Sequence, residues 1–259
     1  MIHICKPLGD SSVEQTEDAL MSMGYPITRR ECVQSDATRA EQLAPQDKGF
    51  ERALRHIFNS DADLCYIDYE HHDHGARDTL NTQAQLRIKR LLVSVAKADG
   101  KETGVYGEPA IWPLHDEPIN AKSIANVSQD GYPDVDAYFC ACYLKKRLPD
   151  TRSALRFIGG VDAWITTMER HRLPIYLMFQ HWVRPDPSEH LPMTQDEAFV
   201  MGYIHGDPRV RTVWWWDELW KNADGEFAVN KQREMLEEAD RVGEHFMAGF
   251  HEGIRAGGI

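Results

Sequence analysis

Two carboxylates stand one residue apart at the end of an apolar run. The run Leu64-Cys65-Tyr66-Ile67 is followed directly by Asp68-Tyr69-Glu70. Because side chains alternate between the two faces of a strand, we expect Asp68 and Glu70 on one face, with Cα atoms roughly 6.5 to 7 Å apart. Such a pair can simply cap the next segment or bind an arginine. Neighbouring acids in different environments can also divide the roles that cleavage of a glycosidic bond requires.

A scaffold for these acids is indicated by short β-rich runs that alternate with longer helical ones. We expect strands at 2–5, 27–33, 63–70, 104–107, 135–143, 174–183 and 210–216. We expect helices at 12–23, 48–58, 78–98, 121–127, 151–172, 194–205 and 231–255. Strand, helix and strand in this order are typical of right-handed βαβ units and a parallel sheet.

The number of expected strands favours closure of this sheet. Seven or eight strands within 259 residues predict an α/β fold, a (β/α)8-like TIM barrel with seven or irregular strands as a variant. We expect residues 1–259 to form one catalytic domain, with the Pro-rich stretch 183–192 as a loop. An open doubly wound sheet is the alternative. Its glycine-rich first turn is missing, because Leu8-Gly9-Asp10-Ser11 is not G-x-G-x-x-G.

The carboxyl ends of barrel strands converge on one rim, which is where barrel enzymes place their catalytic side chains. Besides the two acids, the expected substrate-binding residues there are Tyr106, Glu108, Tyr138, Gln180, His181, Trp216 and Asp217. Tyr143 ends the same expected strand as Tyr138. Aromatic rings stack on the apolar faces of sugars, while the polar groups bind hydroxyls. In Trp214-Trp215-Trp216 we expect Trp216 to face the cleft and Trp215 to pack beneath helices.

These motifs resemble those of TIM-barrel glycoside hydrolases, most specifically the hyaluronidase type. The resemblance rests on Tyr66-Ile67-Asp68-Tyr69-Glu70, on Gly104-Val105-Tyr106-Gly107, and on the later runs Leu173-Pro174-Ile175-Tyr176 and Val213-Trp214-Trp215-Trp216. Lysozymes of the Chalaropsis type look similar as well, because they have Asp-x-Glu followed by an Ile-Tyr strand. The disulfides and the greater length that are usual in hyaluronidases are absent here.

The resemblance implies a glycosidase in which Glu70 is the general acid that protonates the leaving oxygen. Asp68 would stay ionised and either orient a substrate acetamido group, where that group is the nucleophile, or tune the pKa of Glu70. If a separate carboxylate is the nucleophile or base, Glu108 or Asp217 is the candidate. Tyr138 and Gln180 would position the sugar ring.

The run His71-His72-Asp73-His74 suggests a metal-dependent barrel hydrolase that uses His71, His74 and His181 with a carboxylate. The spacing is neither H-E-x-x-H nor another familiar zinc signature. We therefore expect no metal and no other cofactor. A non-catalytic sugar-binding barrel is the other alternative.

Composition limits the partners and the compartment. A net charge of −12 argues against nucleic acid, which needs a basic surface. No apolar run is long enough to span a membrane, and the first residues do not resemble an export signal. The five cysteines read as reduced thiols, so we expect a cytoplasmic protein. The resemblance to glycoside hydrolases implies a carbohydrate as the substrate. The oligomeric state stays open.

Overall fold

The structure is a computed structural model that describes residues 2–4, 12–26, 32–36, 48–68, 79–105, 132–170, 173–179, 182–186, 189–215 and 229–257. The strands are β1 (Ile2–Ile4), β2 (Cys32–Asp36), β3 (Leu64–Asp68), β4 (Glu102–Val105), β5 (Tyr138–Ala141), β6 (Ile175–Phe179), β7 (Trp182–Asp186), β8 (Glu189–Pro192) and β9 (Val210–Trp215). The helices are α1 (Ser12–Ser22), α3 (Lys48–Phe58), α4 (Thr79–Ala98), α6 (Thr151–Glu169), α7 (Gln195–His205) and α8 (Val229–Ala256).

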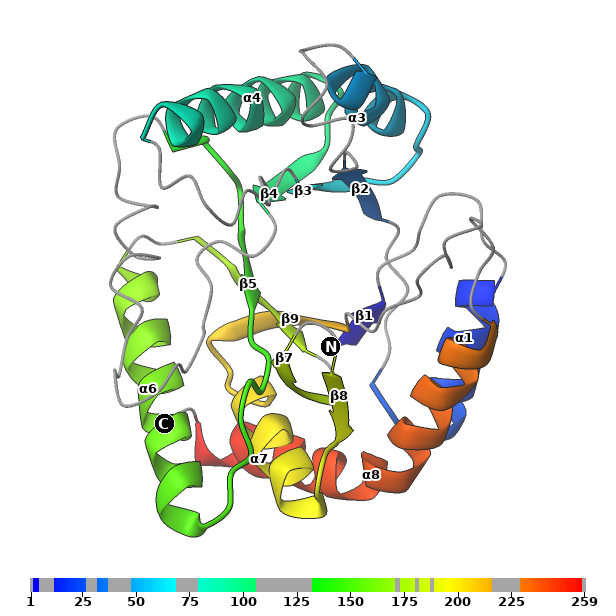
Figure 1. Ribbon diagram of the computed structural model, residues 1–259, viewed down its shortest axis with the longest axis vertical. Helices are drawn as coiled ribbons and strands as arrows, with labels where there is room; N and C mark the ends of the chain where they lie inside the picture. The colour runs from blue at the N-terminus through cyan, green and yellow to red at the C-terminus, as the bar shows by residue number, and fades with distance from the viewer. Residues whose placement is uncertain are drawn as a thin grey trace.

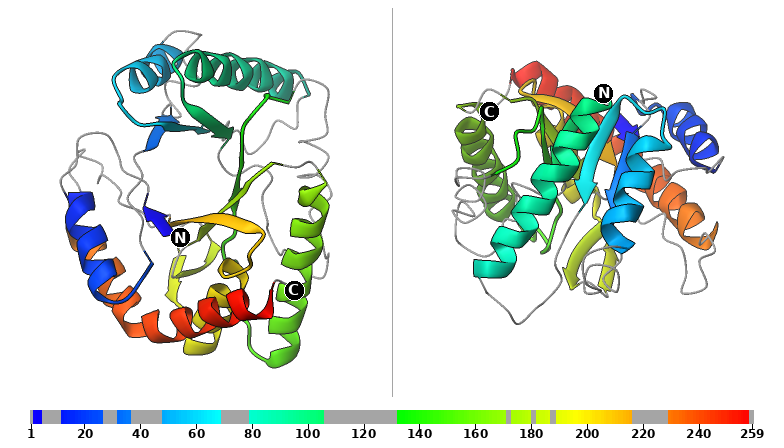
Figure 2. Two further views of the ribbon diagram at one scale, coloured as in Figure 1. Left: turned by 180° about the vertical axis from the view of Figure 1, so that it is seen from behind. Right: turned by 90° about the horizontal axis from the view of Figure 1, so that it is seen from above.

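Two parallel sheets form the centre of the fold. One has the order β2-β3-β4 and the other the order β1-β9-β6-β5, and every pair within them is parallel. The helices lie outside the strands (Figure 1). Figure 2 shows α1 beside α8, where the Tyr25 hydroxyl donates to the Ala239 carbonyl at 2.9 Å. The expected α/β class with parallel strands is confirmed.

The two sheets meet between β4 and β5. The backbone N–H groups of Asp136 and Ala137, just before β5, both donate to the Thr103 carbonyl on β4, at 2.9 and 3.1 Å. At the opposite edges, no pairing joins β1 to β2 among the described residues. The strands are short, and the closed barrel that we expected is therefore not confirmed.

Alternating residues of the strands pack on two different sides. One set forms a cluster that we call the inner cluster: Leu64, Tyr66, Ala137, Phe139, Tyr143, Tyr176 and Met178. The residues between them, including Cys65, Ile67, Cys140 and Leu177, belong to the larger core with the helices. Both sets are buried because each strand has a packed layer on either side, as parallel sheets require.

Aromatic rings fill the inner cluster. The ring of Phe139 stacks on Tyr66 with centroids 5.7 Å apart and meets Tyr176 edge-on at 4.9 Å. The Tyr176 hydroxyl donates to Glu102 Oε1 at 2.7 Å. Gly104 lies against Phe139, since a Cβ there would be 2.0 Å from that ring. The β4 backbone approaches β5 this closely because residue 104 has no side chain.

Helices α7 and α8 cross at glycines. A Cβ at Gly202 would lie 1.9 Å from the Phe246 carbonyl oxygen, and Gly206 meets the backbone of α8 one turn further on. Gly249 and Gly253 make the same kind of contact with the backbone of α7. Two G-x-x-x-G spacings thus let the two helix backbones touch. Within the described ranges, no helix is long and apolar enough to cross a membrane.

Three expected elements differ from the structure. The expected strand at 27–33 overlaps β2, which extends to Asp36 and has only Val33 as a large apolar residue; residues 27–31 lie outside the described residues. The expected strand at 174–183 is two strands, β6 and β7. The stretch 183–192, expected to be a loop, forms the antiparallel hairpin β7-β8, which tolerates Pro185 and Pro192 because both strands of a two-stranded hairpin are edge strands. The expected helix at 121–127 lies outside the described residues.

Candidate functional site

Asp68 is the last residue of β3, the middle strand of its sheet. It is in register with Asp36, the last residue of β2. Leu64 and Tyr66, four and two residues earlier on the same strand, belong to the inner cluster. The backbone therefore places Asp68 at the carboxyl end of a buried parallel strand, where the sequence predicts it.

Most of the other predicted site residues lie outside the described residues. They are Glu70, Tyr106, Glu108, Gln180, His181, Trp216 and Asp217, together with His71 and His74 of the metal alternative. Each substrate-binding candidate of this group comes within three residues of the last residue of a parallel strand: β4 ends at Val105, β6 at Phe179 and β9 at Trp215. Their roles stay predictions.

Tyr138 does not lie where we expected it. It is the first residue of β5, in register with the first residue of β6, so it stands at the amino end of the strand. Its ring is buried among the residues that face the helices, with 4% of its surface exposed. Burial raises the pKa of its hydroxyl to about 12, with a smaller contribution from Cys140. The expected position of Tyr138 at the carboxyl rim is therefore wrong, and its role in substrate binding stays an untested prediction.

Tyr143 is the tyrosine that this strand brings to the inner cluster. It follows the last residue of β5 by two positions, and 5% of its surface is exposed. The Lys145 ammonium group lies 6.0 Å from the centroid of its ring. The sequence could have indicated this placement. Tyr143 is an even number of residues from Ala137 and Phe139 and so shares their face of the strand, whereas Tyr138 does not.

The tryptophan run begins within β9. Trp214 is in register with Met178 of the inner cluster, and Val213 is in register with Leu177 of the helix-facing core. Trp216 has the same parity as Trp214 and follows the last residue of the strand. We expected Trp216, and not Trp215, to face a cleft. The side chains of both residues lie outside the part of the chain that the structure describes, so this stays a prediction.

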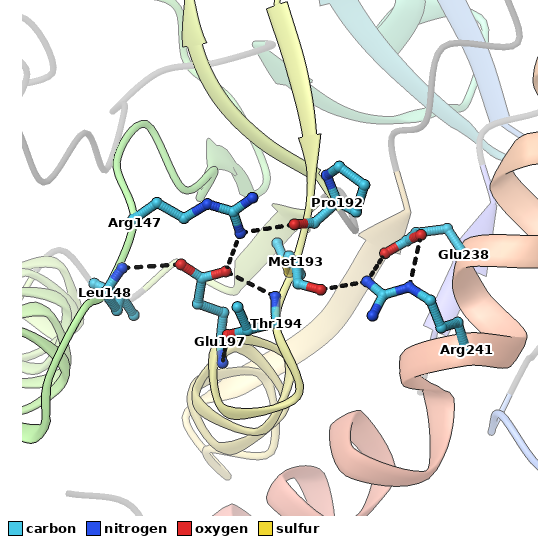
Figure 3. Close-up of polar contacts among 8 residues, drawn as sticks. All are labelled: Arg147, Leu148, Pro192, Met193, Thr194, Glu197, Glu238 and Arg241. Atoms are coloured by element: carbon cyan, nitrogen blue, oxygen red, sulfur yellow. Dashed lines mark hydrogen bonds and ion pairs between the residues drawn. The ribbon is translucent and has the colours of Figure 1, made fainter.

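A buried carboxylate joins two segments that follow strand ends (Figure 3). Glu197 of α7 has 1% of its side chain exposed. Its Oε2 accepts from Arg147 Nη1 at 2.6 Å and from the Thr194 backbone N–H at 2.8 Å, and its Oε1 accepts from the Leu148 backbone N–H at 2.9 Å. Thr194 Oγ1 accepts from the Glu197 N–H, which completes a capping box at the start of α7.

The turn between β8 and α7 is held at three consecutive residues. Arg147 Nη1 donates to the Pro192 carbonyl at 2.7 Å, Arg241 of α8 donates to the Met193 carbonyl, and the Thr194 N–H binds Glu197. Arg241 is itself paired with Glu238. Figure 3 shows these contacts converging on residues 192–194 from both sides.

Three cysteines of the described part lie in the core. The thiols of Cys65, Cys140 and Cys142 are buried, and burial raises the pKa of each, to about 12 for Cys65 and Cys142. They are therefore poor nucleophiles. Across the residues that the structure describes, no group of three or more His, Cys, Asp or Glu side chains could hold a metal ion.

Two solved structures are similar to this chain to different degrees. Bee venom hyaluronidase matches with a TM-score of 0.64 and 12% sequence identity, over 95% of this chain and 98% of that chain. A Bacteroidetes-affiliated GH5 cellulase matches with a TM-score of 0.44 and 11% identity, over 97% of this chain and 95% of that chain. No protein-family model matches the sequence, and no curated protein matches it. At this identity, the first likeness shows a common fold.

Proposed function

We propose that this protein is a glycoside hydrolase that cleaves an oligosaccharide or polysaccharide, including one that contains N-acetylhexosamine. The observation that carries the proposal is the position of Asp68, which ends the middle strand of a parallel sheet and begins the Asp-x-Glu motif. The inner-cluster residues Leu64 and Tyr66 precede it at alternate positions. The fold shared with a hyaluronidase supports the same class of reaction.

In the proposed reaction, Glu70 donates a proton to the glycosidic oxygen as the bond to the leaving group breaks. This role requires a pKa that burial and a nearby negative charge raise toward neutrality. Asp68 stays ionised and supplies that charge, or it orients an acetamido group that attacks the anomeric carbon. Glu108 and Asp217 remain the candidates if a separate carboxylate is the nucleophile or base.

The sugar is bound in this proposal by residues that follow other strand ends. Tyr106, Gln180, His181 and Trp216 keep their predicted roles. Tyr143 takes the place of Tyr138, because it is the tyrosine after β5 that belongs to the inner cluster. An indole, phenols and polar groups on one rim would bind both the faces and the hydroxyls of a pyranose.

A screen of chromogenic glycosides and polysaccharides, with and without a chelator, tests the proposal. We expect chelator-resistant hydrolysis, and a loss of roughly 10² to 10⁴-fold in kcat for Glu70→Gln. Asp68→Asn should also lose most activity. Glu51→Gln is the control, because Glu51 is an exposed acid of α3. Full activity of Glu70→Gln would assign the acid elsewhere. Loss with chelator would favour the metal-dependent hydrolase, and binding without turnover would favour a sugar-binding protein.

A further inference from the structure

The Glu197 carboxylate connects two segments that lie far apart in the sequence. Arg147 and Leu148, two of its donors, belong to the segment between β5 and α6 that begins with Cys142 and Tyr143. Its third donor, Thr194, follows the β7-β8 hairpin. We infer that Glu197 is a positioning residue for the hydrolysis proposed above, on which this inference rests. It fixes the segment of Tyr143 relative to the segment that follows β6.

Helix capping alone does not account for these contacts. A capping box requires only that Glu197 bind the Thr194 N–H. Here the same carboxylate also binds residues 49 and 50 positions earlier in the chain, and it is withdrawn from water. A buried ion pair is no more stabilising, as a rule, than a well-packed apolar replacement. Its particular contribution is a fixed geometry, because each donor has to lie in a defined direction.

The fixed geometry reaches Tyr143 through a closed set of contacts. Leu144, the residue after Tyr143, forms a parallel bridge with Val183 of β7. The neighbouring Trp182 is paired with Pro192 of β8. The Pro192 carbonyl accepts from Arg147, which binds Glu197. The chain after β5 and the chain after β6 are thus joined both beside Tyr143 and at Arg147, and Glu197 holds the second junction.

The side chains of Thr194 and Glu197 hold different parts of the structure, so a variant of Thr194 can serve as the control. Thr194 Oγ1 caps α7 by accepting from the Glu197 N–H at 3.2 Å, without touching the segment of Tyr143. Thr194→Ala therefore weakens the helix cap and leaves the bonds from Arg147 and Leu148 in place. Glu197→Gln keeps the shape of the side chain but removes its charge. The comparison separates stability of α7 from positioning of Tyr143.

Hydrogen exchange and kinetics on the full chain test the inference. For Glu197→Gln we expect amide exchange in residues 142–150 to become roughly tenfold faster, since a charge-assisted hydrogen bond is lost. With the substrate found in the screen, kcat should fall roughly tenfold with a smaller change in KM, because reacting groups become misplaced. Thr194→Ala should speed exchange only at the start of α7 and keep kcat.

Two results would overturn the inference. Unchanged exchange in 142–150 would show that Glu197 does not hold this segment, whether or not the protein hydrolyses a glycoside. Faster exchange with unchanged kcat and KM would show that the segment has no part in the reaction. A wild type that cleaves no glycoside would refute the proposed function itself. Should Glu197→Gln fail to fold, Arg147→Gln replaces it, because the Arg147 side chain is 39% exposed.

Discussion

Asp36 and Asp68 end neighbouring parallel strands in the same register. Adjacent strands lie about 4.8 Å apart, so the two residues bring two acids to one end of the sheet. A nearby negative charge raises the pKa of a carboxyl group. We therefore expect Asp36 to add to the pKa increase that Glu70 would need as the proposed general acid.

We predict that Asp36→Asn shifts the pH-activity profile toward acid. Removal of one negative charge lowers the pKa of the remaining carboxyl groups, so the catalytic acid loses its proton at a lower pH. The measurement is kcat/KM against pH on the substrate identified by the screen. The control is Asp134→Asn, at an exposed acid before β5. A profile that is the same in Asp36→Asn and wild type would remove Asp36 from the site.

The Asp36 position shows what the sequence could and could not predict. The apolar run before Asp68 predicts β3 correctly because both faces of that strand are buried. By contrast, Gln34, Ser35 and Asp36 are polar, so no hydrophobic pattern reveals that β2 continues to Asp36. The partner of a strand also depends on contacts between distant residues, and a register such as Asp36 with Asp68 cannot be read from local spacing.

The same reasoning explains the error at Tyr138. The expected strand 135–143 covers β5, but the backbone pairing with β6 begins only at residue 138. Even in the expected strand, Tyr138 lies five residues before the carboxyl end, and in the structure it is the first residue of β5, so its place in the strand did not support a position on the carboxyl rim. The alternation of side chains along a strand would still have put Ala137, Phe139 and Tyr143 on one face, because residues separated by an even number of positions share a face.

Tyr143→Phe should impair the reaction, whereas Tyr138→Phe should not. We expect Tyr143→Phe to raise KM or lower kcat roughly tenfold, since it removes a hydroxyl at the proposed sugar site. Tyr138→Phe should leave both constants unchanged, because Tyr138 packs against the helices. Steady-state kinetics of the two variants provide the measurement, and thermal unfolding controls for stability. Loss of activity in Tyr138→Phe alone would restore the original assignment.

His205 makes stability depend on pH. Burial lowers its pKa from 6.5 to about 4, although its Nδ1 lies 2.6 Å from the Met201 carbonyl oxygen. Below pH 6.5 the unfolded chain binds a proton that the folded chain does not bind. The free energy of unfolding should therefore fall as the pH decreases from 6.5 to 4, with a slope of at most about 1.4 kcal/mol per pH unit.

Urea unfolding at several pH values measures this dependence. His205→Gln should remove the contribution of His205 and flatten the curve between pH 6.5 and 4. His251→Gln is the matched control, because His251 lies on the same pair of packed helices but is exposed to solvent on α8. An equal slope in wild type and His205→Gln would refute the role of His205.

The crossing of α7 and α8 gives the last prediction. Gly202→Ala should lower the free energy of unfolding by about 1 to 3 kcal/mol, since its Cβ would lie 1.9 Å from a backbone oxygen that cannot rotate away. Gly159→Ala in α6 is the matched control, because a Cβ there meets no atom within 4 Å. In that helix, alanine should raise stability by roughly 0.5 to 1 kcal/mol. Urea unfolding of both variants provides the comparison. If Gly202→Ala were as stable as Gly159→Ala, the two helices would not be held in backbone contact.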